Sequence, residues 1–277
     1  MHEIKHDRPR FLIVAVVVIS FFFVIFPIYY LILTAFKPLD LMFNVPPKFY
    51  FKPSFSAFET VLGEGKAGLY LFNSFIVTTI STVCAVFLGG LAAFVLALVN
   101  IRGKKWLYFT ILITRMYPPV TTLIPIYMIM QMLKLVDHYP ALILPYVGTQ
   151  MALATMIMLS YYKDLPVSIF ESAMLDGCGS LGLFLRFGLP LSKSGLIASG
   201  VLIFVLNWNE FLFAMALTST RIRTAPVALT AYLEQEGLVQ WGSMAAMGSL
   251  MTVPIVIFAL ALRKYMISGL TAGASKE

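Results

Sequence analysis

The chain has 277 residues, of which 60% are hydrophobic and 12% are charged, and its formal net charge is +7. Soluble domains devote about a quarter of their residues to charged side chains, so this composition excludes a soluble globular protein. A mean hydropathy of +0.88 indicates a polytopic membrane protein. In such a chain, positive residues report which side of the membrane each loop occupies, and they are not a nucleic-acid footprint.

Six segments are apolar enough to cross a bilayer as helices, which takes about 20 residues each. Hydrocarbon offers no partner to an unsatisfied peptide group, so each segment is predicted to be helical. Charge is sparse within them: Arg115 lies in the third, and Lys193 and Glu210 lie in the fifth. The sequence predicts an all-α polytopic membrane protein with six transmembrane helices, at residues 11–36, 70–99, 106–133, 139–162, 191–217 and 242–262.

Lysines and arginines are distributed unevenly between the two sides of these spans. Seven lie on one side: Lys37, Lys48, Lys52, Lys66, Lys134, Arg221 and Arg223. Twelve lie on the other side: Lys5, Arg8, Arg10, Arg102, Lys104, Lys105, Lys163, Arg186, Lys193, Arg263, Lys264 and Lys276. The richer side is the cytoplasmic one. We therefore expect both termini, and the loop between the fourth and fifth spans, to lie in the cytoplasm.

The chain divides into three segments of different character. Residues 1–69 hold a basic tail, the first span and an outer loop rich in proline, phenylalanine and lysine. Residues 70–265 hold five spans in quick succession and are predicted to form one compact bundle, and residues 266–277 form a cytoplasmic tail. Gly89 and Gly90 in the second span should allow a neighbouring helix to approach closely.

The loop between the fourth and fifth spans is short, half-polar and rich in glycine. Pro166 suits the first turn of a helix, Gly177 suits its left-handed end, and Ser180 suits the cap of a second short helix. Pro190 is then expected to stop this second helix where the next span begins. The pattern predicts a helix–turn–helix near residues 164–188, lying along the inner surface of the membrane.

The first of these short helices is amphipathic. Its apolar residues recur at helical spacing: Val167, Phe170, Ala173 and Met174. Such a helix either rests on lipid or enters a groove on a partner protein. A lipid-resting helix should carry lysine or arginine on its polar face, whereas this one carries Glu171 and Asp176. The charge pattern therefore favours a protein partner.

Fixed spacings within the loop resemble those of a known family. Glu171-Ser172-Ala173 is followed after three residues by Gly177 and, farther on, by Leu189-Pro190. This pattern resembles the cytoplasmic signature of binding-protein-dependent ABC importer permeases, with Ser172 in place of an alanine and Phe187 in place of an aliphatic residue. Other stretches resemble the carbohydrate-uptake branch of that family, of the maltose type: Arg115–Tyr127, Asp137–Tyr146, Asn207–Ala214, Thr224–Leu229 and the tail Gly269–Glu277.

The resemblance implies the type I importer permease fold, with the loop acting as a coupling helix that docks into a cleft of an ATP-hydrolysing subunit. It assigns the docking to Glu171, Ser172, Ala173, Asp176 and Gly177, and the apolar ridge adds Phe170 and Met174. It further implies a bacterial inner membrane location and three kinds of protein partner: a dimer of ATPase subunits, a second and different permease subunit, and an extracytoplasmic solute-binding protein. The expected solute is a sugar, an oligosaccharide or a polyol.

Cofactors and catalysis are not expected in this chain. The sequence contains no phosphate-binding loop of the form GxxxxGK[ST], so ATP and its magnesium should bind to the partner ATPase. The histidines, cysteines and carboxylates show no metal-ligand spacing and no catalytic constellation. The chain is therefore predicted to be a transport subunit and not an enzyme.

Four polar residues within the spans are candidates for the solute pathway: Arg115, Asn207, Asn209 and Glu210. Amides and a carboxylate suit hydrogen bonds to sugar hydroxyls. However, the same groups also serve as hydrogen bonds between helices that fix a bundle, and for the 207–210 group we favour that interpretation. A direct pair between Arg115 and Glu210 is left open.

Two further functions stay open at this stage. The first is import of a glycerol phosphate or another polar solute by the same kind of machinery. The second is an ion-coupled secondary carrier, which commonly shows inverted repeats and broken helices at matched positions. The sequence shows no such pairing, so the importer is favoured.

Overall fold

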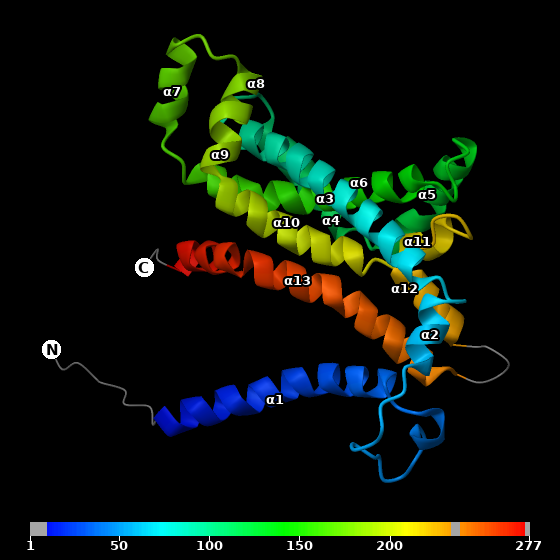
Figure 1. The fold of residues 1–277 in the computed structure, drawn as a ribbon. Helices are drawn as coiled ribbons and strands as arrows, with labels where there is room; N and C mark the ends of the chain where they lie inside the picture. Colours follow the sequence, from blue (N-terminus) through cyan, green and yellow to red (C-terminus); the bar gives the residue numbers. More distant parts are fainter. Residues whose placement is uncertain (1–9, 234–238, 275–277) are drawn as a thin grey trace. The chain divides into compact units, whose positions relative to one another are not determined.

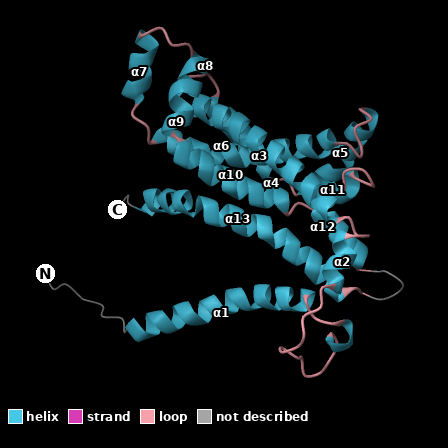
Figure 2. Cartoon of the chain, viewed as in Figure 1, coloured by secondary structure: helices cyan, strands magenta, loops and turns pink. Residues whose placement is uncertain are grey.

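A computed structural model describes residues 10–233 and 239–274, and within these residues the chain is built from helices and loops without a strand (Figure 1 and Figure 2). The predicted all-α architecture is confirmed. The predicted basic tail with Lys5 and Arg8, and Lys276 at the other terminus, lie outside the described residues. The longer helices are α1 (Arg10–Ala35), α3 (Ala67–Leu98), α4 (Lys104–Met116), α5 (Pro119–Met132), α6 (Tyr139–Lys163), α10 (Lys193–Trp208) and α13 (Trp241–Ala274).

Shorter helices connect these elements. They are α2 (Ser56–Leu62), α7 (Val167–Leu175), α8 (Ser180–Leu183), α9 (Leu189–Leu191), α11 (Leu212–Leu217) and α12 (Ala225–Leu229). Two 3₁₀ turns, η1 (Leu39–Leu41) and η3 (Thr230–Tyr232), and one π-helical turn, η2 (Phe184–Gly188), complete the chain.

The chain forms two compact units. Unit 1 combines the described parts of Met1–Ala67 and Leu229–Thr252, and unit 2 combines Gly68–Ala228 with the described part of Val253–Glu277. Within unit 2, α6 packs against α4 and α10, while α11 packs against α5 and α6 (Figure 1). Unit 2 contains the loop that the sequence singled out.

Four described helices are long and apolar enough to span a membrane: Leu12–Ala35, Ala67–Leu98, Tyr139–Lys163 and Trp241–Leu262. They correspond to the first, second, fourth and sixth predicted spans. A fifth span arises only if Ser180–Leu191 and Lys193–Trp208 are taken together, and these two segments are bent by 80°.

The third predicted span is two helices, which corrects the prediction of a single segment over residues 106–133. α4 ends at Met116 and α5 starts at Pro119. Proline lacks an N–H and disfavours helical geometry in the residue before it. Accordingly, Tyr117 and Pro118 are extended, with ψ of 128° and 133°. The Tyr-Pro-Pro sequence therefore interrupts the helix.

The fifth predicted span is also interrupted. α10 ends at Trp208, and α11 starts only at Leu212. The Glu210 carboxylate accepts hydrogen bonds from the backbone N–H groups of Phe213 (2.9 Å) and Ala214 (3.2 Å). A carboxylate at this position satisfies free N–H groups of a new helix, so Glu210 starts α11 and does not lie inside a continuous span.

The core at one end of unit 2 is a cluster of aromatic rings around Phe94 of α3. Its ring lies 5.5 Å from Tyr162 of α6, 5.6 Å from Phe170 of α7 and 5.5 Å from Phe184 of the π-helical turn, each in edge-to-face geometry. Aromatic pairs at such distances add about 0.5–1.5 kcal/mol each beyond area burial. These rings join α7 to two of the long helices.

The opposite end of unit 2 is held by buried polar contacts. Asn73 of α3 donates to the Arg223 carbonyl (3.1 Å) and accepts from the Tyr139 hydroxyl (2.7 Å). The hydroxyl of Ser74 accepts from the N–H of Ala225, the first residue of α12 (2.8 Å). Buried polar groups are stabilising when they are paired, so these contacts fix the loops at this end onto α3.

Candidate functional site

The docking loop, which we define as residues 166–191, begins with a short helix that ends as predicted at a left-handed glycine. Gly177 has φ of +84°. The Cys178 N–H donates to the Ala173 carbonyl, and the Gly177 N–H donates to the Met174 carbonyl, both at 3.0 Å. These two bonds form a Schellman motif. The motif gives α7 a sharply defined C-terminus.

One face of α7 is buried in unit 2. Phe170 and Ala173 belong to the ring cluster around Phe94. Both were predicted to contact the ATPase, and the structure corrects this assignment because neither side chain is accessible to a partner. Apolar spacing identified the helix but did not show which apolar residues would face inward. Phe170 and Ala173 instead anchor α7 to the bundle.

The rest of the α7 surface is open. Val167 and Met174 are 54% and 53% exposed, and Leu175 is 89% exposed. The other predicted docking residues are exposed as well: Glu171, Ser172, Asp176 and Gly177. Leu175 was missed by the sequence reasoning. The signal was present, because an apolar residue two positions after the buried Ala173 must project from the far side of a helix.

The second half of the docking loop differs in detail from the predicted helix–turn–helix. α8 begins at Ser180, but Gly179 occupies the cap position and no side-chain cap hydrogen bond is formed. Pro190 lies within the first two positions of α9 and does not act as a stop. Between them, residues 184–188 form a π-helical turn. The predicted capping role of Ser180 and the stop at Pro190 are therefore wrong.

The docking loop lies at the same end of unit 2 as the loop between α3 and α4. The shared core contains Leu96 of α3, Ile111 of α4 and Phe170 of α7, and Figure 1 shows α7 beside α8 at this end. Six basic residues lie in or directly beside these two loops: Arg102, Lys104, Lys105, Lys163, Arg186 and Lys193. This grouping is the one used for the prediction of membrane orientation.

Glu210, a predicted pathway residue, has structural partners. Besides starting α11, its carboxylate accepts a hydrogen bond from the hydroxyl of Tyr146 in α6. This contact links the α10–α11 connection to α6. The pair with Arg115, which the sequence left open, is not formed, since the Arg115 guanidinium donates to Gln150 (3.4 Å).

The two asparagines before Glu210 also have local roles. Asn207 is buried, and its side-chain amide donates to the Thr82 hydroxyl of α3 (3.3 Å), which links α10 to α3. The Asn207 side-chain oxygen is buried without a partner among the described residues. Asn209 donates to the Val205 carbonyl one turn earlier (2.8 Å). These contacts agree with hydrogen bonds that fix the bundle.

Arg115 stands at the break between α4 and α5 and is exposed. Because Pro118 and Pro119 lack N–H groups, the carbonyls of Thr114 and Arg115 cannot receive their helical hydrogen bonds. Met116 and Tyr117, next to them, are also exposed. The break therefore presents a guanidinium and free carbonyl groups together on the surface of this chain.

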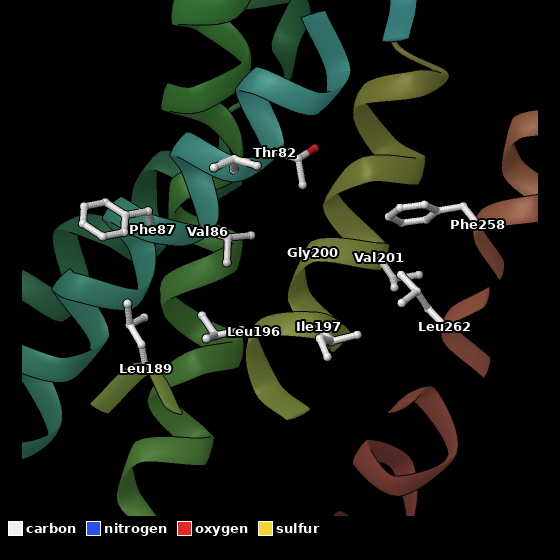
Figure 3. Close-up of a pocket in the computed structure, with 11 residues that line it drawn as sticks. Thr82, Val86, Phe87, Leu189, Leu196, Ile197, Gly200, Val201, Phe258 and Leu262 are labelled. Carbon is white, nitrogen blue, oxygen red and sulfur yellow. The ribbon is translucent and has the colours of Figure 1, made fainter. Parts of the chain in front are cut away.

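A groove of about 390 Å³ runs between α3, α10 and α13 within unit 2 (Figure 3). Phe258 and Leu262 of α13 face the side of α10 that carries Ile197 and Val201, and Thr82 contributes the groove's hydroxyl. A sugar hydroxyl that leaves water needs a hydrogen-bond partner, and the walls offer almost none. This groove is not built to hold a sugar.

Metal binding has no support in the described part of the chain, where no three histidine, cysteine or carboxylate side chains gather closely enough to hold an ion.

Comparison with known proteins identifies the family. A family model described as "binding-protein-dependent transport system inner membrane component" matches residues 85–271. The chain is 32% identical over 270 residues to the trehalose/maltose transport system permease protein MalG of Thermococcus litoralis, covering 96% of this chain and 97% of that one.

A second relative and a solved structure agree with this match. The diacetylchitobiose uptake system permease protein DasC of Streptomyces coelicolor is 30% identical, over 94% of each chain. The crystal structure of a bacterial ABC transporter that imports the acidic polysaccharide alginate shares the fold, with a TM-score of 0.78 at 20% identity over 96% of this chain and 99% of that one. The chain therefore belongs to the family of inner membrane components of binding-protein-dependent transport systems.

Proposed function

We propose that this chain is one of two permease subunits of an ATP-driven importer for a sugar, an oligosaccharide or a polyol, and that it couples to the ATPase through the exposed face of α7. Its family supports an ATPase and a solute-binding protein as general partners. The relatives named for trehalose/maltose and diacetylchitobiose support a carbohydrate solute.

The observation that carries the coupling role is the division of α7 into two faces. Phe170 and Ala173 hold the helix to the ring cluster, whereas Val167, Met174 and Leu175 project outward beside Glu171 and Asp176. Exposed apolar residues on a short helix with a sharply defined C-terminus are suited to insertion into a partner's cleft. A movement imposed on this face reaches α3 and α6 through the rings of Phe94 and Tyr162.

The solute pathway is proposed to run past the break between α4 and α5. Non-helical backbone at membrane depth is tolerated where it is buried in protein or lines a water-filled cavity, and here it is exposed on the surface of this chain. A charged side chain inside a membrane faces such a cavity for the same reason. Arg115 and the free carbonyls of residues 114–115 would then offer hydrogen bonds to solute hydroxyls.

The second permease subunit is proposed to complete this pathway. The groove of unit 2 is apolar, and the exposed polar break at Arg115 needs a facing wall. ATP and magnesium are assigned to the ATPase. Both termini and the docking loop are assigned to the cytoplasm by the positive-residue count of their loops, in a bacterial inner membrane.

The test is to tag the chain at its N-terminus in its native host and determine the composition and stoichiometry of the purified assembly. We expect two copies of an ATPase beside one copy of this chain and one of a different permease. Recovery of the chain alone, or only with itself, would contradict the proposal and favour an ion-coupled carrier.

The solute is then identified through the binding protein encoded with the complex. Its melting temperature is measured against a panel of oligosaccharides, polyols and glycerol phosphates, and the hits are tested for stimulation of ATP hydrolysis by the complex in proteoliposomes. Stimulation by glycerol phosphates alone would replace the carbohydrate assignment.

A further inference from the structure

A buried lysine with no counter-charge lies in unit 1. Lys37 follows α1 by two residues and is only 5% exposed. Among the described residues its ammonium has no carboxylate and no hydrogen-bond acceptor, and its closest partners are the rings of Tyr30 and Phe51, with centroids at 6.0 Å and 5.8 Å. Cation–π contacts at this range are weak. A lysine residue that is buried to this extent is rarely left without an anionic partner.

Lys37 lines a pocket of about 240 Å³ whose other walls combine four apolar or small residues with four polar ones. They are Leu39, Met42, Ser56, Ala57, Thr60, Gln240, Gly242 and Ser243. Three of these residues carry hydroxyl groups, and Gln240 carries an amide. The volume is below the range of about 300–1,000 Å³ typical of sites for drug-sized ligands. The pocket therefore fits a single small group rather than an oligosaccharide.

The pocket also contains the N-terminal turn of α13. This helix starts at Trp241 and has 34 residues, and Gly242 and Ser243 of its first turn line the pocket. The backbone N–H of Ser243 has no backbone acceptor among the described residues. The start of a long helix presents free N–H groups and the positive end of the helix dipole, which together favour an anion. The helix N-terminus and the Lys37 ammonium therefore both favour a negatively charged ligand.

The position of the pocket along the chain indicates the source of that anion. The apolar span of α1 ends at Ala35, and the apolar span of α13 starts at Trp241, so the pocket lies at the level where hydrocarbon gives way to headgroups. Trp241, next to Gln240 and Gly242 in the chain, is exposed, as aromatic residues at a membrane interface commonly are. At this depth the abundant anion is the phosphate of a phospholipid.

We propose that this pocket binds the phosphate group of a phospholipid headgroup, held by the Lys37 ammonium, the hydroxyls of Ser56 and Ser243, and the N-terminal turn of α13. The inference concerns unit 1 alone and does not depend on the docking loop or on the transported solute. It assigns to Lys37 a ligand that the described residues of this chain do not supply.

The experiment measures phospholipid retention by native mass spectrometry. The assembly containing this chain is purified in detergent, delipidated, and titrated with phosphatidylglycerol, using wild type, Lys37→Gln and Lys48→Gln. Lys48 is an exposed lysine of the same loop and serves as the matched control. We expect wild type and Lys48→Gln to retain one lipid that Lys37→Gln binds roughly ten-fold more weakly or worse, as for the loss of one charge-assisted hydrogen bond.

Two further measurements distinguish a lipid phosphate from free phosphate, and a ligand-binding role of Lys37 from a structural one. Millimolar inorganic phosphate is added to the lipid-loaded wild type, and displacement of the retained lipid would assign the pocket to free phosphate and overturn the lipid assignment. Thermal unfolding of each variant is recorded with and without lipid. Equal lipid retention by wild type and Lys37→Gln, with a lower melting temperature for the variant, would leave Lys37 a purely structural cation and would also overturn the proposal.

Discussion

Gly89 of α3 and Ala154 of α6 are in such close contact that a Cβ atom built on Gly89 would lie 2.5 Å from the Cβ of Ala154 and 2.7 Å from the carbonyl oxygen of Met151. The backbones of these two membrane helices therefore meet at Gly89. The neighbouring Gly90 differs, because its nearest atoms would be 3.9 Å away. The predicted close approach holds for Gly89 and not for Gly90.

This pair gives a matched test of helix packing. Gly89→Ala should destabilise the protein by about 1–3 kcal/mol, because the helices must separate. Gly90→Ala should be neutral or should stabilise it by up to about 1 kcal/mol, because alanine favours the helix and space is available. Thermal unfolding of the purified assembly distinguishes the two. Equal effects of the two substitutions would contradict the close approach.

The left-handed end of α7 predicts how Gly177 tolerates substitution. A Cβ atom there would meet nothing within 4 Å, so the cost comes from the backbone alone and is about 1–2 kcal/mol for most residues. Gly177→Asn should transport nearly as well as wild type, because asparagine tolerates this conformation. Gly177→Val should uncouple ATP hydrolysis from uptake.

The measurement is solute uptake and ATP hydrolysis by the same proteoliposomes. Membrane insertion of each variant is the control. Normal uptake by the Gly177→Val variant would mean that the shape of this helix end is not needed for coupling.

The two faces of α7 predict opposite outcomes for two apolar residues. Phe170→Ala removes a buried ring and should destabilise unit 2 by about 3–5 kcal/mol. Leu175→Ser changes an exposed side chain, so its effect on stability should stay within about 0.5 kcal/mol, while the ATPase should be lost from the purified complex on washing. Melting temperature and ATPase stoichiometry are measured together. Full ATPase retention by the Leu175→Ser variant would remove this residue from the docking surface.

Asp137 predicts a pH-dependent contribution to stability at the other end of unit 2. Its carboxylate accepts hydrogen bonds from the N–H (3.0 Å) and hydroxyl (2.8 Å) of Ser219, and from the N–H groups of Thr220 and Arg221. Burial raises the pKa of Asp137, but the hydrogen bonds from Ser219, Arg221 and Thr220 outweigh it and hold that pKa well below its usual range.

Because the pKa of Asp137 is lower in the folded protein than in the unfolded chain, its ionised carboxylate stabilises the fold. This contribution is complete above the unfolded pKa of about 3.9 and is lost as the pH falls through the folded pKa. Asp137→Asn keeps the left-handed backbone geometry of this position, where φ is +61°, but removes the charge. The melting temperature of wild type should exceed that of the variant at pH 7, and the gap should narrow below about pH 4. A gap that stays constant with pH would contradict this account.

Sequence reasoning located the docking loop because its signals are local. Gly177 fixes a helix end through its own backbone freedom, and Glu171 and Asp176 are conspicuous in an apolar chain. The inward orientation of Phe170 depended on Phe94, Tyr162 and Phe184, which come from other elements, and helical spacing alone cannot reveal such contacts.

The interruptions of the spans were only partly predictable. Tyr117-Pro118-Pro119 is a strong local stop, and greater weight on it would have divided the third span correctly. At the break before α11, Glu210 accepts local hydrogen bonds from Phe213 and Ala214. Its second contact, with Tyr146, is 64 residues away in the chain and could not be predicted from the local sequence. The burial of Lys37 likewise requires unit 1 to assemble from two distant segments.

The division of α7 into an anchored face and an open face also bears on how such a subunit evolves and how it can be redesigned. Substitutions at Val167, Met174 and Leu175 can follow changes in a partner's cleft, since none of these side chains is fully buried in the bundle. The ring cluster around Phe94 can remain unchanged while these exposed residues vary. A permease could therefore be moved to a different ATPase by exchanging a few surface residues, with the membrane helices left as they are.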